Sequence, residues 1–118
     1  KYDEAFRGYL LSILDRKLEK EQVKVEVYNG SGIAGAAGQM ARKIENSGCD
    51  VVRYENAPDL LESTVLYVPD EERFRESLAV VKEVVGTNVE VINDRPVFMT
   101  TGDIVVVLGK DIEKIYSF

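Results

Sequence analysis

The sequence predicts an α+β domain in which two helices pack on a mixed sheet of four or five strands. The first observation is hydrophobic spacing, which alternates along the chain between a period of two and a period of three to four residues. The second is the continuous apolar run Ile104–Leu108, which is typical of a strand covered on both faces. The third is the order of the segments, β-α-β-β-α-β-β after an extra N-terminal helix.

Length, charge and hydrophobic runs limit the kinds of protein that this chain can be. The 118 residues fit a connector at 1–22 followed by a single domain at 23–118. The net charge of −6 falls entirely in the second part, and an acidic surface repels the phosphates of nucleic acids. The longest apolar run has five residues, too few to span a membrane. We therefore expect a soluble globular fold that does not bind nucleic acid.

Residues 2–20 are predicted to form an amphipathic helix. Apolar side chains recur there at spacings of three and four residues, at Phe6, Tyr9, Leu10, Ile13 and Leu14. We favour a packing or connector helix, since amphipathic helices mostly bury their apolar stripe within their own fold. The alternative is a segment that mediates a homodimer.

A strand, a glycine turn and a helix follow. The valines at 23, 25 and 27 alternate with Lys24, Glu26 and Tyr28, which predicts a strand with one buried and one solvated face. The helix should run from about Ala34 to Ser47 and end at Gly48, a natural left-handed stop. Its inward residues should be Ala37, Met40, Ala41 and Ile44.

The second half repeats this alternation. Strands are expected at Asp50–Glu55, Thr64–Val68, Val89–Ile92 and Ile104–Leu108. A helix should begin with Asp70 as its N-cap, run to about Val85, and turn Phe74, Leu78, Val81 and Val85 inward. Leu60–Ser63 is a candidate helical turn. If it is a true crossover, a three-layer, doubly wound α/β sheet is the alternative fold.

The glycine turn Gly30–Gly35 matches G-x-G-x-x-G, the spacing of dinucleotide-binding loops, and Glu55 follows 20 residues later. Such loops follow a central strand that is apolar throughout, whereas Lys24 and Glu26 predict a solvated face here. Only 63 residues remain after Glu55, too few for a second nucleotide-binding half. We favour a tight turn with close helix–sheet packing, and a nucleotide- or phosphate-binding enzyme fragment is the alternative.

Catalytic chemistry has little support in this sequence. There is no histidine, and the single Cys49 follows the helix-stop glycine, where a small buried apolar side chain is expected. We predict no enzyme activity, cofactor or metal. A ligand site, if present, should use the backbone donors near a helix start. Its candidate residues are Asn29, Gly30, Ser31 and Gly32, joined by Lys110 and Asp111.

Four separate blocks together resemble the LytR C-terminal domain family. They are Val25–Gly35, Ser47–Val51, Thr64–Pro69 and Gly102–Asp111, and the resemblance covers roughly residues 23–112. The family tends to place an aromatic residue after the helix-stop glycine, where this chain has Cys49. This departure changes a packing residue and leaves the candidate site unaltered.

The resemblance implies a non-catalytic accessory module of the bacterial cell envelope. Such a domain would lie outside the membrane, tethered by an N-terminal segment, and would dock a wall polymer or a protein partner. Family names that refer to regulators or attenuators do not imply DNA contact in so acidic a chain. The phosphotransfer associated with these proteins belongs to a different, upstream domain.

Overall fold

The computed structural model describes residues 21–98 and 100–112. The predicted helix at 2–20 and its alternative role in dimerisation lie outside these residues. Among the helices that are described, none is both long and apolar enough to cross a membrane.

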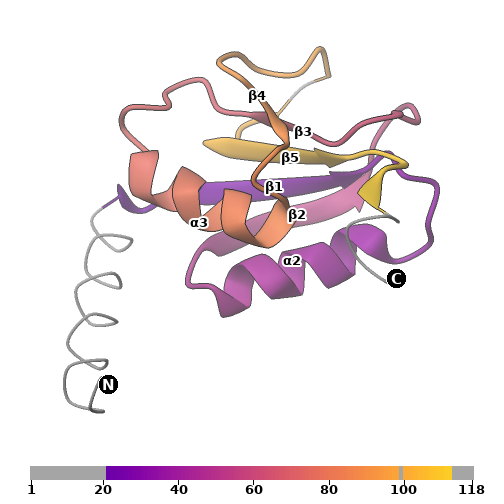
Figure 1. Ribbon diagram of the computed structural model, residues 1–118, viewed down its shortest axis with the longest axis horizontal. Helices are drawn as coiled ribbons and strands as arrows, with labels where there is room; N and C mark the ends of the chain where they lie inside the picture. The colour runs from indigo at the N-terminus through magenta and orange to yellow at the C-terminus, as the bar shows by residue number, and fades with distance from the viewer. Residues whose placement is uncertain (1–20, 99, 113–118) are drawn as a thin grey trace.

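A single mixed sheet organises the domain, as the sequence predicts (Figure 1). In chain order the elements are β1 (Lys24–Asn29), α2 (Ala36–Asn46), β2 (Asp50–Asn56), β3 (Val65–Tyr67), α3 (Arg75–Val85), β4 (Glu90–Ile92) and β5 (Ile104–Leu108). The strand order is β2-β1-β5-β3-β4. β1 pairs in parallel with β2 and β5, and β3 pairs in parallel with β4 but antiparallel with β5.

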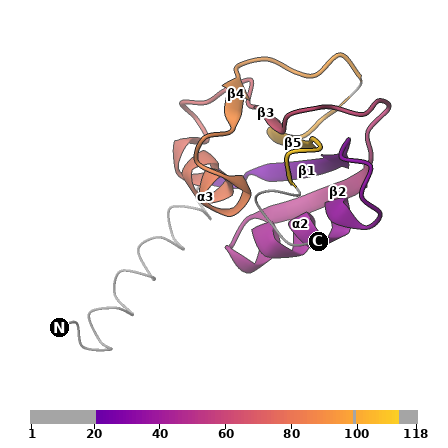
Figure 2. The ribbon, with the colours of Figure 1, turned by 45° about the vertical axis from the view of Figure 1, so that its right-hand side comes forward.

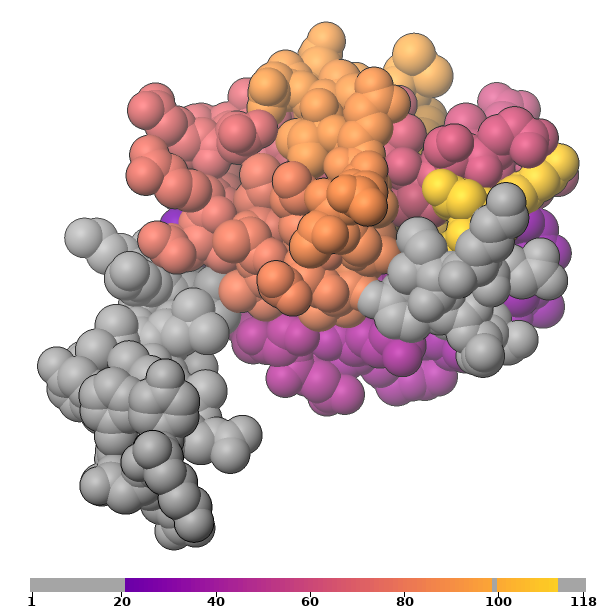
Figure 3. Space-filling model, in the orientation of Figure 1, coloured from indigo at the N-terminus to yellow at the C-terminus, as the bar shows by residue number. Residues whose placement is uncertain are grey.

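Both helices cover the same face of the sheet (Figure 2). All eight residues predicted to face inward are buried in one core, including Phe74, which immediately precedes α3. Alternate residues of β1, β3 and β5 complete this core. In Figure 3 the surfaces of α2 and α3 adjoin. The helical turn expected at Leu60–Ser63 does not form, so the doubly wound alternative is wrong.

The opposite face of β1 is buried, which corrects the prediction of a solvated face. Glu26 is 1% exposed and Tyr28 is 2% exposed, whereas Lys24 is exposed as expected. The cover comes from the connection between β4 and β5, where the Phe98 ring packs edge-on against Tyr28 with centroids 4.9 Å apart. β1 is therefore an interior strand covered on both faces, although its sequence alternates.

The helix starts differ from those predicted. α2 begins at Ala36 after Gly35, which takes a left-handed φ of 79°. α3 begins at Arg75, and Asp70 does not cap it: its carboxylate accepts a hydrogen bond from the backbone N–H of Arg73 in the preceding turns. Cys49 lies buried beside the core, as predicted.

Candidate functional site

The turn that follows β1 is held together by its own side chains. Asn29 Oδ1 accepts hydrogen bonds from the Ser31 N–H (3.0 Å) and the Ser31 hydroxyl (2.5 Å). Asn29 Nδ2 donates to the Ile33 carbonyl at 2.7 Å, and the Ile33 N–H donates to Ser31 Oγ at 3.1 Å. These bonds involve both polar atoms of the Asn29 amide, so Asn29 and Ser31 shape the loop.

Gly30 is required by close approach of the backbone. Its N–H donates to the Leu108 carbonyl at 2.8 Å, and a Cβ at this position would lie only 2.8 Å from that same oxygen. Gly32 takes a left-handed φ of +81°, whereas Gly30 is not among the glycines with a positive φ. In the described part of the chain, the N–H groups of Gly32 and Ala34 have no hydrogen-bond acceptor.

Lys110 and Asp111 fasten the end of β5 to the segment before β3. Asp111 Oδ1 accepts hydrogen bonds from Thr64 N–H at 2.9 Å and Thr64 Oγ1 at 2.7 Å. Thr64 Oγ1 in turn accepts the Gly109 N–H at 3.0 Å. The ammonium group of Lys110 lies 3.2 Å from Glu62 Oε1, in an exposed ion pair. Neither side chain joins the glycine turn.

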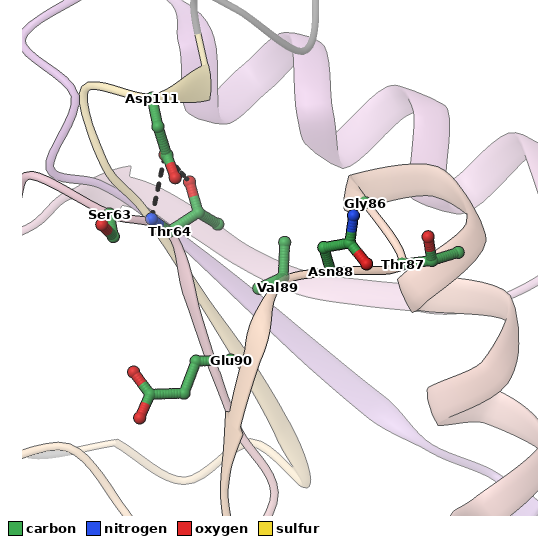
Figure 4. A pocket seen from close by; sticks show the side chains of 8 residues that line it. All are labelled: Ser63, Thr64, Gly86, Thr87, Asn88, Val89, Glu90 and Asp111. Atoms are coloured by element: carbon green, nitrogen blue, oxygen red, sulfur yellow. Dashed lines mark hydrogen bonds between the residues drawn. The ribbon is translucent and has the colours of Figure 1, made fainter.

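Two hollows lie along one edge of the sheet, where β1, β2 and β5 end and β3 and β4 begin. The first, of about 360 Å³, is lined by Asn29, Gly32, Ile33, Ala34, Asn56, Ala57 and Leu60. The second, of about 530 Å³, is lined by Ser63, Thr64, Gly86, Thr87, Asn88, Val89, Glu90 and Asp111 (Figure 4).

The predicted site is thus divided between these hollows. Asn29 and Gly32 line the first and Asp111 lines the second, while Gly30, Ser31 and Lys110 line neither. No sequence pattern marks the residues that the end of α3 and the start of β4 bring to the second hollow, because Thr87, Asn88 and Glu90 form no motif. The parallel pairing of β4 with β3 and the antiparallel pairing of β3 with β5 together bring this segment near Asp111.

Two ionisable side chains among the described residues, Cys49 and Tyr28, have a raised pKa. No group of three or more metal-ligating side chains occurs among them. Burial, with a smaller contribution from the charge of Glu21, raises the pKa of the Cys49 thiol to about 11, so it is a poor nucleophile at neutral pH. Burial and the hydrogen bond to Glu26 raise the pKa of Tyr28 to about 12.

Comparison with solved structures gives two alignments, of which the first shows a shared fold. The soluble domain of a conserved hypothetical secreted protein from Mycobacterium marinum aligns with a TM-score of 0.56 and 23% identity, over 75% of this chain and 60% of that one. The C-terminal domain of RV0431 aligns with a TM-score of 0.46 and 24% identity, over 74% of this chain and 71% of that one. The chain therefore spans less than two thirds of the M. marinum structure.

The search of curated proteins gives no significant match. The family model described as "LytR cell envelope-related transcriptional attenuator" matches residues 22–111, which include both hollows and every strand of the sheet. This match agrees with the four blocks from which the resemblance was recognised. The chain belongs to the LytR C-terminal domain family.

Proposed function

We propose that this domain is a non-catalytic accessory module of the bacterial cell envelope that docks a wall polymer outside the membrane. The observation that carries the proposal is the family match over residues 22–111. The M. marinum structure establishes the fold alone, and its description as a secreted protein agrees with an extracytoplasmic placement. Tethering through an N-terminal segment is part of the same proposal.

The first hollow is the surface best suited to an uncharged stretch of such a polymer. It has no ionisable side chain in its lining. It combines the amide of Asn56, the exposed N–H groups of Gly32 and Ala34, and the aliphatic side chain of Leu60, which is 62% exposed. Amides and aliphatic groups together match the hydroxyl groups and C–H faces of a sugar.

Co-sedimentation with purified, insoluble cell wall tests this function. We expect the wild-type domain to sediment with the wall, and the double variant Asn56→Ala/Leu60→Ala to sediment several-fold less. Both positions are exposed, so the variant should change the free energy of unfolding by no more than about 0.5 kcal/mol per site. Gly30→Ala would be a poor probe, since its Cβ would collide with the Leu108 carbonyl.

Glu83→Gln provides the matched control, because Glu83 is exposed on α3 and lines neither hollow. A wild-type domain that stays in the supernatant contradicts wall binding. If it instead binds a purified envelope protein, the partner is a protein. Equal sedimentation of the double variant and the wild type would remove the first hollow from the docking surface.

The exposed N–H groups of Gly32 and Ala34 near the start of α2 favour a second candidate, a nucleotide- or phosphate-binding site. A thermal-shift series with NAD, FAD and nucleotides discriminates between the two. Ligand binding stabilises a folded domain by RT ln(1 + [L]/Kd), so micromolar binding at millimolar ligand would raise Tm measurably. We expect no shift, and a clear rise in Tm would favour the nucleotide-binding alternative.

A further inference from the structure

β2 forms an open edge of the sheet. It stands at one end of the strand order and pairs with β1 alone (Figure 1). With seven residues it is the longest of the described strands. In the part of the chain that the structure describes, no group hydrogen-bonds the backbone of β2 on the side away from β1. Such an edge offers unpaired N–H and C=O groups to another strand.

Little in the sequence of β2 protects this edge from association. Edge strands are commonly short or carry lysine or proline, whereas β2 is long and has neither residue. Val52 is 49% exposed and Tyr54 is 59% exposed, although both side chains are largely apolar. Val52 has no partner on β1, because the register shifts there, and this bulge leaves Arg53–Asn56 as the regular stretch. A further strand would therefore pair with the second half of β2.

The side chains of this stretch are divided between the two faces of the sheet. Arg53 is in register with Glu26 of β1, so Arg53 and Glu55 lie on the face away from the helices. Tyr54 lies on the helix face, where a Cβ on Gly38 of α2 would be 3.5 Å from its ring. Arg53 and Glu55 are both exposed, and within the described residues neither makes an ion pair or a hydrogen bond. Two opposite charges on one face of the edge are thus left without a partner.

We propose that β2 pairs antiparallel with β2 of a second copy of this chain, about a two-fold axis at Tyr54. In this register Arg53 lies opposite Glu55 of the second copy, and the symmetry repeats the pair on the other side of the axis. Tyr54 lies opposite its own counterpart. Opposite charges and aromatic rings at directly opposed positions both stabilise an antiparallel pair.

This charge complementarity depends on the register. A two-fold axis at Arg53 would place two guanidinium groups opposite each other, and an axis at Glu55 would place two carboxylates opposite each other. The net charge of −6 opposes association, but salt screens exposed charges beyond about 8 Å at physiological ionic strength. Because the paired stretch is short, we expect a weak and reversible dimer with a Kd on the order of 100 μM.

Sedimentation velocity of the complete chain, over a concentration range that spans this Kd, measures the association. We expect Glu55→Arg to weaken it about tenfold, since both Arg53–Glu55 pairs become pairs of like charge. This substitution also lowers the net negative charge, which by itself would favour association. Glu83→Arg is the matched control, because it makes the same charge change at an exposed position of α3 and should not weaken the dimer.

Exchange of the two charges tests the register. Arg53→Glu should weaken the dimer about tenfold, and the double variant Arg53→Glu/Glu55→Arg should return the Kd to within about threefold of wild type. A mixture of the two single variants should form a heterodimer, because one chain then carries two acidic and the other two basic side chains at these positions. Circular dichroism checks that each variant folds, and Glu55→Arg alone decides if Arg53→Glu does not.

A wild-type chain that stays monomeric at the highest concentration overturns the proposal. A dimer that Glu55→Arg leaves unchanged also overturns it, and would place the interface elsewhere, such as in residues 2–20. Failure of the double variant to associate more tightly than Glu55→Arg contradicts the axis at Tyr54. If a monomeric chain instead pairs β2 with an extended segment of an envelope protein, the edge binds a foreign strand and self-association is wrong.

Discussion

Glu26 shows how one residue can join two distant parts of the domain. Its carboxylate is buried on β1, where Oε1 accepts the Tyr28 hydroxyl at 2.5 Å. Oε2 accepts hydrogen bonds from the Thr101 hydroxyl at 3.1 Å and the Thr101 N–H at 3.3 Å. Thr101 lies 75 residues away, in the connection to β5. Glu26 therefore holds this connection against the sheet.

The electrostatics of Glu26 give a pH dependence. Burial raises its pKa, but hydrogen bonds from Tyr28 and Thr101 and the charge of Arg53 outweigh burial and hold the pKa below the usual 4.5. A carboxyl group with a lowered folded-state pKa stabilises the fold above pH 4.5, and this contribution is lost as pH falls through the folded-state pKa.

We therefore predict that Glu26→Gln lowers the free energy of unfolding by about 1–3 kcal/mol at pH 7, since the amide puts a donor into a site of donors. The difference from wild type should shrink below pH 4.5. Urea unfolding at pH 7 and pH 3 measures it. A difference that is the same at both pH values would contradict a charged Glu26.

At the scale of residues, the sequence predicts correctly which apolar side chains are buried, but not which polar side chains are buried. The inward faces of both helices follow from spacing alone, and the burial of Cys49 from its place after the helix-stop glycine. Glu26 is predicted to be solvated, but it is buried because Thr101, in the connection between β4 and β5, bonds its carboxylate. The position of that connection depends on strand order. Asn29 and Ser31 are candidate ligand residues in the sequence, and no local pattern predicts that they hydrogen-bond to each other.

At the scale of elements, α3 depends on a residue outside its own segment. Phe74 occupies the N-cap position and makes no side-chain cap. Instead, Glu21 Oε2 accepts the Glu76 N–H at 2.9 Å, and Glu21 Oε1 accepts the Ser77 N–H at 2.8 Å and the Ser77 hydroxyl at 2.5 Å. A carboxylate at a helix N-terminus bonds free N–H groups and complements the dipole.

We predict that Glu21→Ala lowers the free energy of unfolding by about 1–2 kcal/mol through loss of this cap. Glu83→Ala, which removes a charge from the exposed face of the same helix, should stay within about 0.5 kcal/mol of wild type. Chemical denaturation of both variants measures the difference. Equal stability of the two variants would show that the distant cap does not stabilise α3.

Periodicity was sufficient to predict which elements exist, and insufficient to place their starts. All five strands and both described helices of the predicted domain form in the predicted order. The local sequence predicts Asp70 as the N-cap of α3. The carboxylate that caps α3 in the structure belongs to Glu21, which is 55 residues from Glu76 in sequence. No local pattern reveals a partner so distant.

At the scale of the molecule, strand order determines which strand ends lie together at the edge of the sheet that carries the two hollows. β1 lies between β2 and β5 and is therefore an interior strand. The antiparallel pairing of β5 with β3 puts the ends of three strands beside the starts of two others. The sequence predicts the α+β class, and it groups the candidate site residues into one cluster. The segment Leu60–Thr64 bonds to Gly30, Lys110 and Asp111, so distinct hollows result.

Wall binding by the wild-type domain tests the central claim most directly, with Asn56→Ala/Leu60→Ala and Glu83→Gln measured alongside. The fraction of protein that sediments with purified cell wall is recorded as wall is added. We predict saturable binding by the wild type and Glu83→Gln, and several-fold weaker binding by the double variant. A wild-type domain that remains in solution at every wall concentration would contradict its assignment as a wall-docking module.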